Sequence, residues 1–281
     1  MLVIEQIIEN ALAEDIGDGD HTSVATIPEG AMGRAQLLVK EEGILCGVPV
    51  AEQVFHQVDP GLNLAIFMQD GAPIKKGDVV FEVSGRIISI LKSERLVLNF
   101  MQRLSGIATA TQRVVKQTEG LRSRILDTRK TTPGLRELEK YAVVTGGGTN
   151  HRMGLYDMIM IKDNHVDYSG GIVPAIEAVH DHLAKIGKEL KIEIEVRNLD
   201  ELKQVLDHGR VDRIMLDNFP VDEMKKALGL IDGRFETEAS GGISEGNVRA
   251  YAETGVDFIS VGALTHQIKS LDMSLKAVKA L

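Results

Sequence analysis

The sequence predicts an α/β protein with a β-rich N-terminal part and a C-terminal part in which strands and helices alternate. Short strand-like runs separated by Gly, Pro and Asp occupy residues 34–91, a pattern typical of a compact β-rich domain. From residue 124 onward, six strand candidates are separated by helical stretches. This alternation requires right-handed crossovers and a parallel sheet, either open or closed into a barrel. Six strands are fewer than the eight of a complete barrel.

The composition excludes several classes of protein. Of the 281 residues, 43% are hydrophobic and 26% are charged, as in ordinary globular domains. The net charge of −9 has the wrong sign for a general nucleic-acid binder, so an anionic ligand requires a local cationic pocket. No stretch approaches the roughly 18 apolar residues of a membrane helix, and the N-terminus lacks a basic region before an apolar one. We therefore expect a cytoplasmic protein with no membrane contact.

The N-terminal elements are predicted from periodicity and turn signals. Apolar residues at helical spacing predict an amphipathic helix over residues 2–15, which the Gly-rich acidic run 14–20 ends. Cys46, the single cysteine, excludes an internal disulfide and lies in an apolar run, which indicates packing. The turn at residues 70–80 resembles that of biotinyl and lipoyl carrier domains, but neither of its lysines has the sequence context of a modified lysine. The predicted strands of this part are 35–39, 62–68, 79–83 and 86–90.

The second half begins with a helix expected over residues 94–118. Its strands are predicted at 124–127, 158–162, 191–196, 213–217, 235–239 and 258–261, and its helices include 172–186, 199–207 and 245–254. Residues 270–281 are predicted to form a C-terminal helix that packs back on the first domain.

Polar and charged residues recur where these strands end. In parallel α/β folds the carboxyl ends of the strands face one crevice, so we expect these residues to converge there. They are Asp127–Lys130, Lys162–His165, Glu195, Asp217 and Asn218, Ser240–Gly242, and Gly262.

The strand at 191–197 carries two carboxylates on one face, because alternation places Glu193 and Glu195 together. A buried unpaired charge costs several kcal/mol or more, so each carboxylate needs a partner. We expect Glu195, near the strand end, to serve the site, and Glu193, one pleat deeper, to form a salt bridge.

Glycine-rich turns mark candidate anion sites. The stretches 238–244 and 260–266 follow consecutive strands, and Gly lets backbone N–H groups approach a phosphate closely. The run Gly146–Gly148 lacks dinucleotide-binding spacing and is interpreted as a bend that delivers His151 and Arg152. His180 and His182 lie two apart on a predicted helix, which does not suit metal chelation and indicates surface positions.

Further segments combine with those described above into one pattern: 13–23, Glu94-Arg95, Asn99-Phe100, 104–109, Asp127–Arg136, Gly146–Arg152, Ile161–His165, Met215–Asn218, Ala239–Ile243 and Ser260–His266. Together these segments resemble a known family, quinolinate phosphoribosyltransferase, almost from end to end. Arg197 is a departure, because relatives often have an acidic or neutral residue there.

The resemblance implies a type II phosphoribosyltransferase with an N-terminal α/β sandwich and a C-terminal incomplete, six-stranded α/β barrel. The implied boundaries are residues 1–108 for the sandwich, 109–268 for the barrel and 269–281 for the C-terminal helix. The implied reaction joins quinolinate to phosphoribosyl pyrophosphate with Mg²⁺ and releases nicotinate mononucleotide, pyrophosphate and CO₂ in de novo NAD synthesis. The implied assembly is a homodimer or a higher homo-oligomer such as a hexamer.

The resemblance also implies roles for individual residues. Quinolinate carries two adjacent carboxylates, which suit bidentate recognition by Arg. Its implied contacts are Thr128, Arg129, Lys130, His151, Arg152 and Lys162, with Arg95 contributed across the dimer interface. The implied catalytic residues are Lys130, Lys162, Glu195 and Asp217, with Glu195 and Asp217 near ribose hydroxyls or the water shell of Mg²⁺. Ser240, Gly241, Gly242, Val261, Gly262, Ala263 and His266 are the implied phosphoribosyl pyrophosphate contacts. No general base is expected.

Two alternatives compete with this interpretation. One is a paralogue on the same scaffold, such as a protein linked to molybdate transport or a transferase that prefers nicotinate. The other is a non-catalytic sensor of a phosphate ligand. Turnover separates the sensor from both enzymes, and the choice of base separates the two enzymes.

Overall fold

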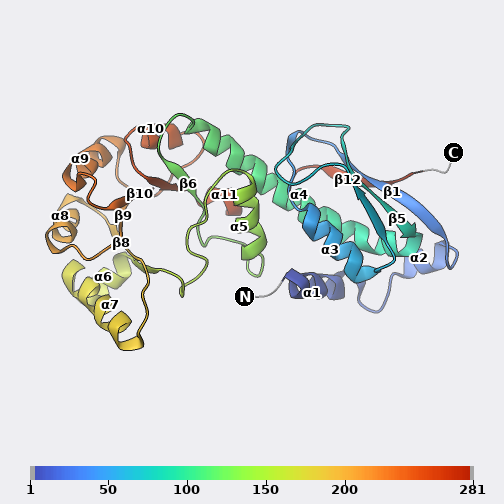
Figure 1. The fold of residues 1–281 in the computed structure, drawn as a ribbon, viewed down its shortest axis with the longest axis horizontal. Helices are drawn as coiled ribbons and strands as arrows, with labels where there is room; N and C mark the ends of the chain where they lie inside the picture. Colours follow the sequence, from blue (N-terminus) through green and yellow to red (C-terminus); the bar gives the residue numbers. More distant parts are fainter. Residues whose placement is uncertain (1–3, 279–281) are drawn as a thin grey trace. The chain divides into compact units, whose positions relative to one another are not determined.

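The computed structural model describes residues 4–278 and divides into two compact units. The first unit contains the residues up to Gln112, Thr131–Gly147 and the residues from Leu264 on. The second contains Arg113–Lys130 and Gly148–Ala263. Figure 1 shows the helices and strands of both units. Within the described residues, no helix is both long and apolar enough to span a membrane.

The first unit is built on a four-stranded antiparallel sheet in the order β12-β1-β5-β3. The aromatic rings of Phe55 on α3 and Phe81 on β5 meet edge to face, with centroids 5.8 Å apart, which packs helix on sheet. Cys46 is buried, as expected from its apolar neighbours. The elements are α1 (Ile4–Ile16), α2 (His21–Thr26), β1 (Met32–Val39), β2 (Gly43–Ile44), α3 (Val48–Val58), β3 (Asn63–Ile66), β4 (Pro73–Ile74), β5 (Val79–Arg86), α5 (Arg136–Thr145), α11 (Ala263–His266), β12 (Met273–Ala277) and most of α4 (Ile87–Gln117).

The strand predicted over residues 86–90 is wrong, because α4 begins at Ile87. The β-branched run was locally compatible with a strand, but β5 ends at Arg86. Ile90 is buried on the same helical stripe as Val97 and Leu104, each seven residues apart, so tertiary packing overrides local propensity.

The helix predicted over residues 270–281 is also wrong. Met273–Ala277 form β12, which pairs antiparallel with β1 from Ala35↔Ala277 to Val39↔Met273. Met273 and Leu275 are buried whereas Lys276 is exposed, a period of two that suits a strand. The segment does join the first unit, as a strand of its sheet, and the last three residues of the prediction lie outside the described residues.

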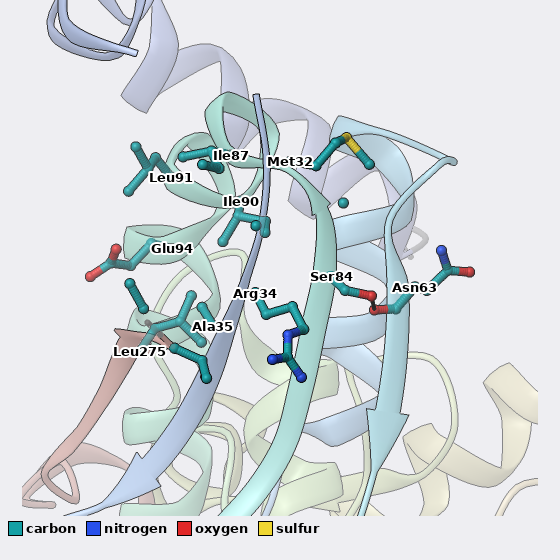
Figure 2. A pocket seen from close by; sticks show the side chains of 14 residues that line it. Met32, Arg34, Ala35, Asn63, Ser84, Ile87, Ile90, Leu91, Glu94 and Leu275 are labelled. Carbon is teal, nitrogen blue, oxygen red and sulfur yellow. Dashed lines mark hydrogen bonds between the residues drawn. The ribbon is translucent and has the colours of Figure 1, made fainter. Parts of the chain in front are cut away.

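A pocket of about 610 Å³ lies in the first unit, between the start of α4 and the strands β1 and β5. Figure 2 shows Ile87, Ile90 and Leu91 on one side of it and Arg34 and Ser84 on the strands. Its lining is mostly apolar, and no residue of the predicted site lines it.

The second unit contains a six-stranded parallel sheet in the order β6-β11-β10-β9-β8-β7. β6 and β7 form its edges, so the sheet has the order expected of an incomplete barrel, and helices surround the strands in Figure 1. All six predicted strands are confirmed within two residues: β6 (Arg124–Leu126), β7 (Ile159–Ile161), β8 (Ile192–Val196), β9 (Arg213–Asp217), β10 (Glu236–Ser240) and β11 (Phe258–Ser260). The helices are α6 (Asp163–Ser169), α7 (Ile172–Ile186), α8 (Leu199–His208), α9 (Val221–Ile231) and α10 (Val248–Ala252).

One face of this sheet, called the inner face below, carries charged side chains. Register places Glu193 on β8 beside Arg213 on β9, and Arg213 beside Glu236 on β10. The guanidinium of Arg213 also stacks 4.0 Å above the ring of Phe258 on β11. An aromatic ring and ion pairs therefore fill this part of the inner face, where apolar side chains are usual.

Candidate active site

The carboxyl ends of β7, β8 and β9 bring together a lysine and two carboxylates. Lys162 directly follows β7, and its Nζ lies 3.3 Å from Oε2 of Glu195 on β8. The Glu195 side chain is 8% exposed and that of Lys162 is 46% exposed. Burial raises the pKa of Glu195; Lys162 opposes this, and the nearby carboxylate of Asp217 adds to it. The strand ends thus hold a cation and two neighbouring anions, as the sequence predicted.

The local fold after β7 fixes the direction of Lys162. Its backbone N–H donates to Nδ1 of His165 at 2.9 Å, and α6 begins at the next residue. His165 therefore ties the end of the strand to the first turn of the helix. The sequence marked His165 as part of the polar strand end but not as a cap.

A tight turn follows β10 beside the end of β9. Asn218 adopts φ +57°, donates from its backbone N–H to the Ser240 carbonyl at 2.9 Å and from Nδ2 to Oδ2 of Asp217 at 2.6 Å. Gly241 has φ +99°, and a Cβ there would collide with Oδ1 of Asn218. Gly242 also has positive φ, with open space where a Cβ would stand. This geometry fits a backbone cradle for an anion.

Two arginines, one after β6 and one before β7, interact electrostatically. Burial lowers the pKa of Arg152, and the charge of Arg129 lowers it further, so the two guanidinium groups interact repulsively. Nη1 of Arg152 donates to the Met158 carbonyl at 3.1 Å, which holds it in place. Lys130 follows Arg129, and its backbone N–H donates to Oγ1 of Thr128 at 3.0 Å. Such a cation pair favours an anionic ligand.

Beneath Arg152, His151 is buried in an ion-pair cluster. Its Nε2 lies 3.2 Å from Oε2 of Glu193 and 3.2 Å from Oε2 of Glu238. Nη1 of Arg213 lies 3.2 Å from the same oxygen of Glu238 and 3.8 Å from Glu193. The salt bridge predicted for Glu193 is therefore confirmed.

With a neutral imidazole, the two carboxylates and the single guanidinium of the cluster leave one negative charge. One additional proton, on His151 or on a carboxylate, makes the cluster neutral. Burial lowers the pKa of His151, but the two carboxylates outweigh it and raise the pKa. The Arg152 amide decides the protonation, because it donates to Nδ1 at 2.7 Å and needs a lone pair there, so the ring carries a single proton, on Nε2. Burial and Glu238 raise the pKa of Glu193 to about 7, so this carboxyl can take the additional proton.

The ligand atoms of His151, Glu193 and Glu238 lie within 4.8 Å of one another, a spacing that could hold a metal ion. The guanidinium of Arg213 already supplies a cation against Glu238. The group is therefore interpreted as an ion-pair cluster.

Sequence reasoning missed Arg213 and Glu238. The signal was present, because β10 repeats the Glu-x-Glu alternation of β8, with Glu236 and Glu238 on one face. It did not specify the register between strands, which places Arg213 among these carboxylates.

The remaining predicted residues have the following places. Ser240 ends β10, and Val261 follows β11 and donates from its N–H to the Leu126 carbonyl. Gly262 and Ala263 come next in the chain. Arg95 and His266 are exposed residues of the first unit, and their roles stay predictions. The side chain of His151 is 5% exposed and points to the inner face, so direct contact with a ligand also stays a prediction.

Comparison with known proteins gives consistent matches over most of the chain. Residues 20–105 match the family model "Quinolinate phosphoribosyl transferase, N-terminal domain", and residues 107–276 match its C-terminal counterpart. A chloroplastic nicotinate-nucleotide pyrophosphorylase (carboxylating) of Arabidopsis thaliana is 46% identical, covering 97% of this chain and 82% of the relative. A probable nicotinate-nucleotide pyrophosphorylase of Bacillus subtilis is 42% identical, with coverage of 98% and 93%.

Solved structures are consistent with these sequence matches. The nicotinate-nucleotide pyrophosphorylase of Francisella tularensis superposes with a TM-score of 0.91 at 40% identity, covering 98% of this chain and 96% of that one. The chain belongs to the quinolinate phosphoribosyltransferase family.

Proposed function

We propose that the protein transfers phosphoribosyl from phosphoribosyl pyrophosphate to quinolinate and releases CO₂, giving nicotinate mononucleotide and pyrophosphate for NAD synthesis. The observation that carries the proposal is the division of one set of strand ends into a cationic and an anionic part. Arg129 and Arg152, after β6 and before β7, interact with each other, and so do Glu195 and Asp217 at the ends of β8 and β9. The family and its relatives' names support the same reaction.

The cationic part suits quinolinate. Its two adjacent carboxylates match two guanidinium groups whose charges repel each other. Lys130 and Thr128 follow and precede Arg129 in the same loop and complete the proposed contacts. A base with a single carboxylate, such as nicotinate, would leave part of this charge uncompensated.

The other part suits the phosphoribosyl donor. As pyrophosphate leaves C1 of the ribose, positive charge develops on the sugar, so positioning and electrostatics supply most of the catalysis. In our proposal Lys162 and Lys130 stabilise the departing pyrophosphate, whereas Glu195 and Asp217 hold ribose hydroxyls. The turn at Gly241 and Gly242, with Ser240 and residues 261–263, holds the 5′-phosphate.

Decarboxylation then needs no dedicated base. Alkylation of the ring nitrogen makes a pyridinium that stabilises negative charge at C2, so the C2 carboxylate leaves as CO₂ and C2 takes up a proton. The cations that bind quinolinate fix the orientation of the ring during both steps.

The donor set fits Mg²⁺, which prefers oxygen ligands and retains several waters. Glu195 and Asp217 offer carboxylate oxygens at neighbouring strand ends. Bound with pyrophosphate, Mg²⁺ would neutralise the leaving group; the two carboxylates would orient its water shell.

We further propose a homodimer in the cytoplasm, in which Arg95 of one protomer completes the quinolinate site of the other. Arg95 is exposed on α4 and has no hydrogen-bond or ion-pair partner within the described residues. The names of some plant relatives place those proteins in chloroplasts or mitochondria.

The test is turnover of purified protein with quinolinate, phosphoribosyl pyrophosphate and Mg²⁺. CO₂ and nicotinate mononucleotide are measured together, and nicotinate serves as the parallel substrate. Equal amounts of both products from quinolinate alone are expected. Product from nicotinate, or binding of both ligands with no product, would overturn the proposal in favour of a paralogue or a sensor.

A further inference from the structure

His151 is fixed on three sides, although its side chain is almost fully buried. Its backbone N–H donates to Oδ1 of Asp127 at 2.8 Å, just after β6. Nε2 faces Glu193 and Glu238 on the inner face of the sheet. Nδ1 accepts the backbone N–H of Arg152 at 2.7 Å. The imidazole thus joins the interior of the sheet to the backbone of a residue at the proposed quinolinate site.

The groups around the ring come from four strands. Glu193 lies on β8 and Arg213 on β9. Glu238 lies on β10, and the Phe258 ring that stacks on Arg213 lies on β11. Glu193 and Glu238 are both fully buried, so neither is placed to touch a ligand at the strand ends. Their effect on a ligand must therefore pass through another residue.

Arg152 is the residue through which such an effect can pass. Its backbone N–H is held by His151 and its guanidinium by the Met158 carbonyl. A rotation of the imidazole would release the first of these hydrogen bonds and shift the start of the Arg152 side chain. Bidentate recognition of a carboxylate is sensitive to such shifts, because both N–H···O bonds require alignment.

We propose that Glu193 and Glu238 are positioning residues for quinolinate, which orient Arg152 by fixing the imidazole of His151. This inference rests on the proposed function, because quinolinate is the ligand that Arg152 is taken to bind. It assigns the buried carboxylates a role in the affinity for one substrate only. The affinity for the phosphoribosyl donor, which we propose is held by other residues, should not change.

The first experiment compares two replacements at Glu238 that fill the same space. Glu238→Gln keeps an oxygen that can face Nε2 of His151, whereas Glu238→Met removes it. Quinolinate binding is measured by calorimetry without phosphoribosyl pyrophosphate, and KM is measured for both substrates. We expect quinolinate to bind about 10-fold or more weakly to Glu238→Met. Its affinity for Glu238→Gln should stay within about 3-fold of wild type. KM for phosphoribosyl pyrophosphate should change less than about 2-fold in both variants.

Glu236→Met is the matched control. Glu236 precedes Glu238 by two residues on β10 and lies 3.2 Å from Nη2 of Arg213, but its ion pairs, to Arg213 and Lys191, do not include His151. Its replacement should leave quinolinate affinity within 2-fold of wild type. Equal weakening in Glu236→Met and Glu238→Met, unchanged quinolinate binding in Glu238→Met, or equal loss for both substrates would overturn the inference.

A measurement on the wild-type protein does not depend on the folding of any variant. Nitrogen-15 NMR of the histidine rings should show, for His151, an Nδ1 that carries no proton and an Nε2 that does, near neutral pH. A proton on Nδ1 would remove the link to the Arg152 amide and overturn the inference. Failure of wild-type protein to bind quinolinate would instead count against the proposed function, and the NMR result would stand independently.

Discussion

Nζ of Lys162 lies 3.3 Å from Oε2 of Glu195, and this ion pair joins the ends of the adjacent strands β7 and β8. The carboxylate is nearly buried, whereas the lysine remains half exposed. The pair therefore holds a cation in place while leaving it accessible to a ligand. Because water reaches the half-exposed Lys162, we expect this pair to add less stability than a fully buried one.

Replacing Lys162 should impair turnover far more than stability. We expect Lys162→Met to lower kcat about 10²- to 10³-fold, because it removes the charge that we propose faces the departing pyrophosphate. Lys191→Met is the control: Lys191 precedes β8 at its other end and forms a similar exposed ion pair with Glu236. Steady-state kinetics and thermal unfolding of both variants check this. Similar kcat losses in the two variants would contradict the assignment of Lys162.

Gly241 should be required for binding of the phosphoribosyl donor. Gly241→Ala places a methyl group against Asn218 in a backbone conformation with φ +99°, which we expect to cost about 1–3 kcal/mol and to distort the turn. KM for phosphoribosyl pyrophosphate should rise about 10-fold or more. Gly187→Ala is the control, because Gly187 ends α7 with φ +63° and open space around it. It should lower stability but not change KM, and a normal KM in Gly241→Ala would remove the turn from the site.

The strands of the second unit could be predicted from sequence because their apolar or alternating residues recur between helical stretches, a pattern that needs no distant contacts. The alternation in β8 also separated Glu193, which forms the salt bridge, from Glu195, which lies near Lys162. A pleat of period two determines which side chains share a face, and distance along the strand determines which of them reaches its end.

The errors arose where distant contacts decide the local structure. Residues 86–90 look like a strand, but the helical stripe of Ile90, Val97 and Leu104 is buried. The strand β12 requires the edge of β1, more than 230 residues earlier in the chain, to supply its hydrogen bonds. The cluster around His151 likewise depends on register between β8, β9 and β10, which no single strand encodes.

Acid sensitivity should depend in part on Asp59. Arg86 Nε donates to its Oδ2 at 2.8 Å and Ser89 Oγ at 2.7 Å, which hold the pKa of Asp59 below its usual value. A carboxyl whose pKa is lower in the folded state stabilises the fold above its unfolded pKa, and this contribution is lost as pH falls toward the folded pKa. Asp59→Asn should therefore be less stable at pH 7, and its free energy of unfolding should fall less between about pH 5 and pH 2.

Denaturant unfolding at several pH values checks this prediction. Asp15→Asn, which also removes one carboxyl, is the control, because Asp15 is exposed on α1. Its pH dependence should match that of wild type. Parallel curves for Asp59→Asn and wild type would show that the contacts of Asp59 add no acid-sensitive stability.

Arg95 should act on the active site of a second protomer. Arg95→Ala and Lys162→Met should each be nearly inactive alone, because in our proposal one lacks the arginine that the partner protomer contributes and the other lacks the lysine at the strand ends. After subunit exchange, a heterodimer has one site with both changes and one site with neither. Random exchange makes half of the dimers mixed, so activity should recover to about a quarter of wild type. Sedimentation confirms the dimer, and the dilution dependence of the recovery confirms exchange. If the activity of the mixture is only the mean of the activities of the two separate variants, Arg95 acts within its own chain or has no part in the reaction.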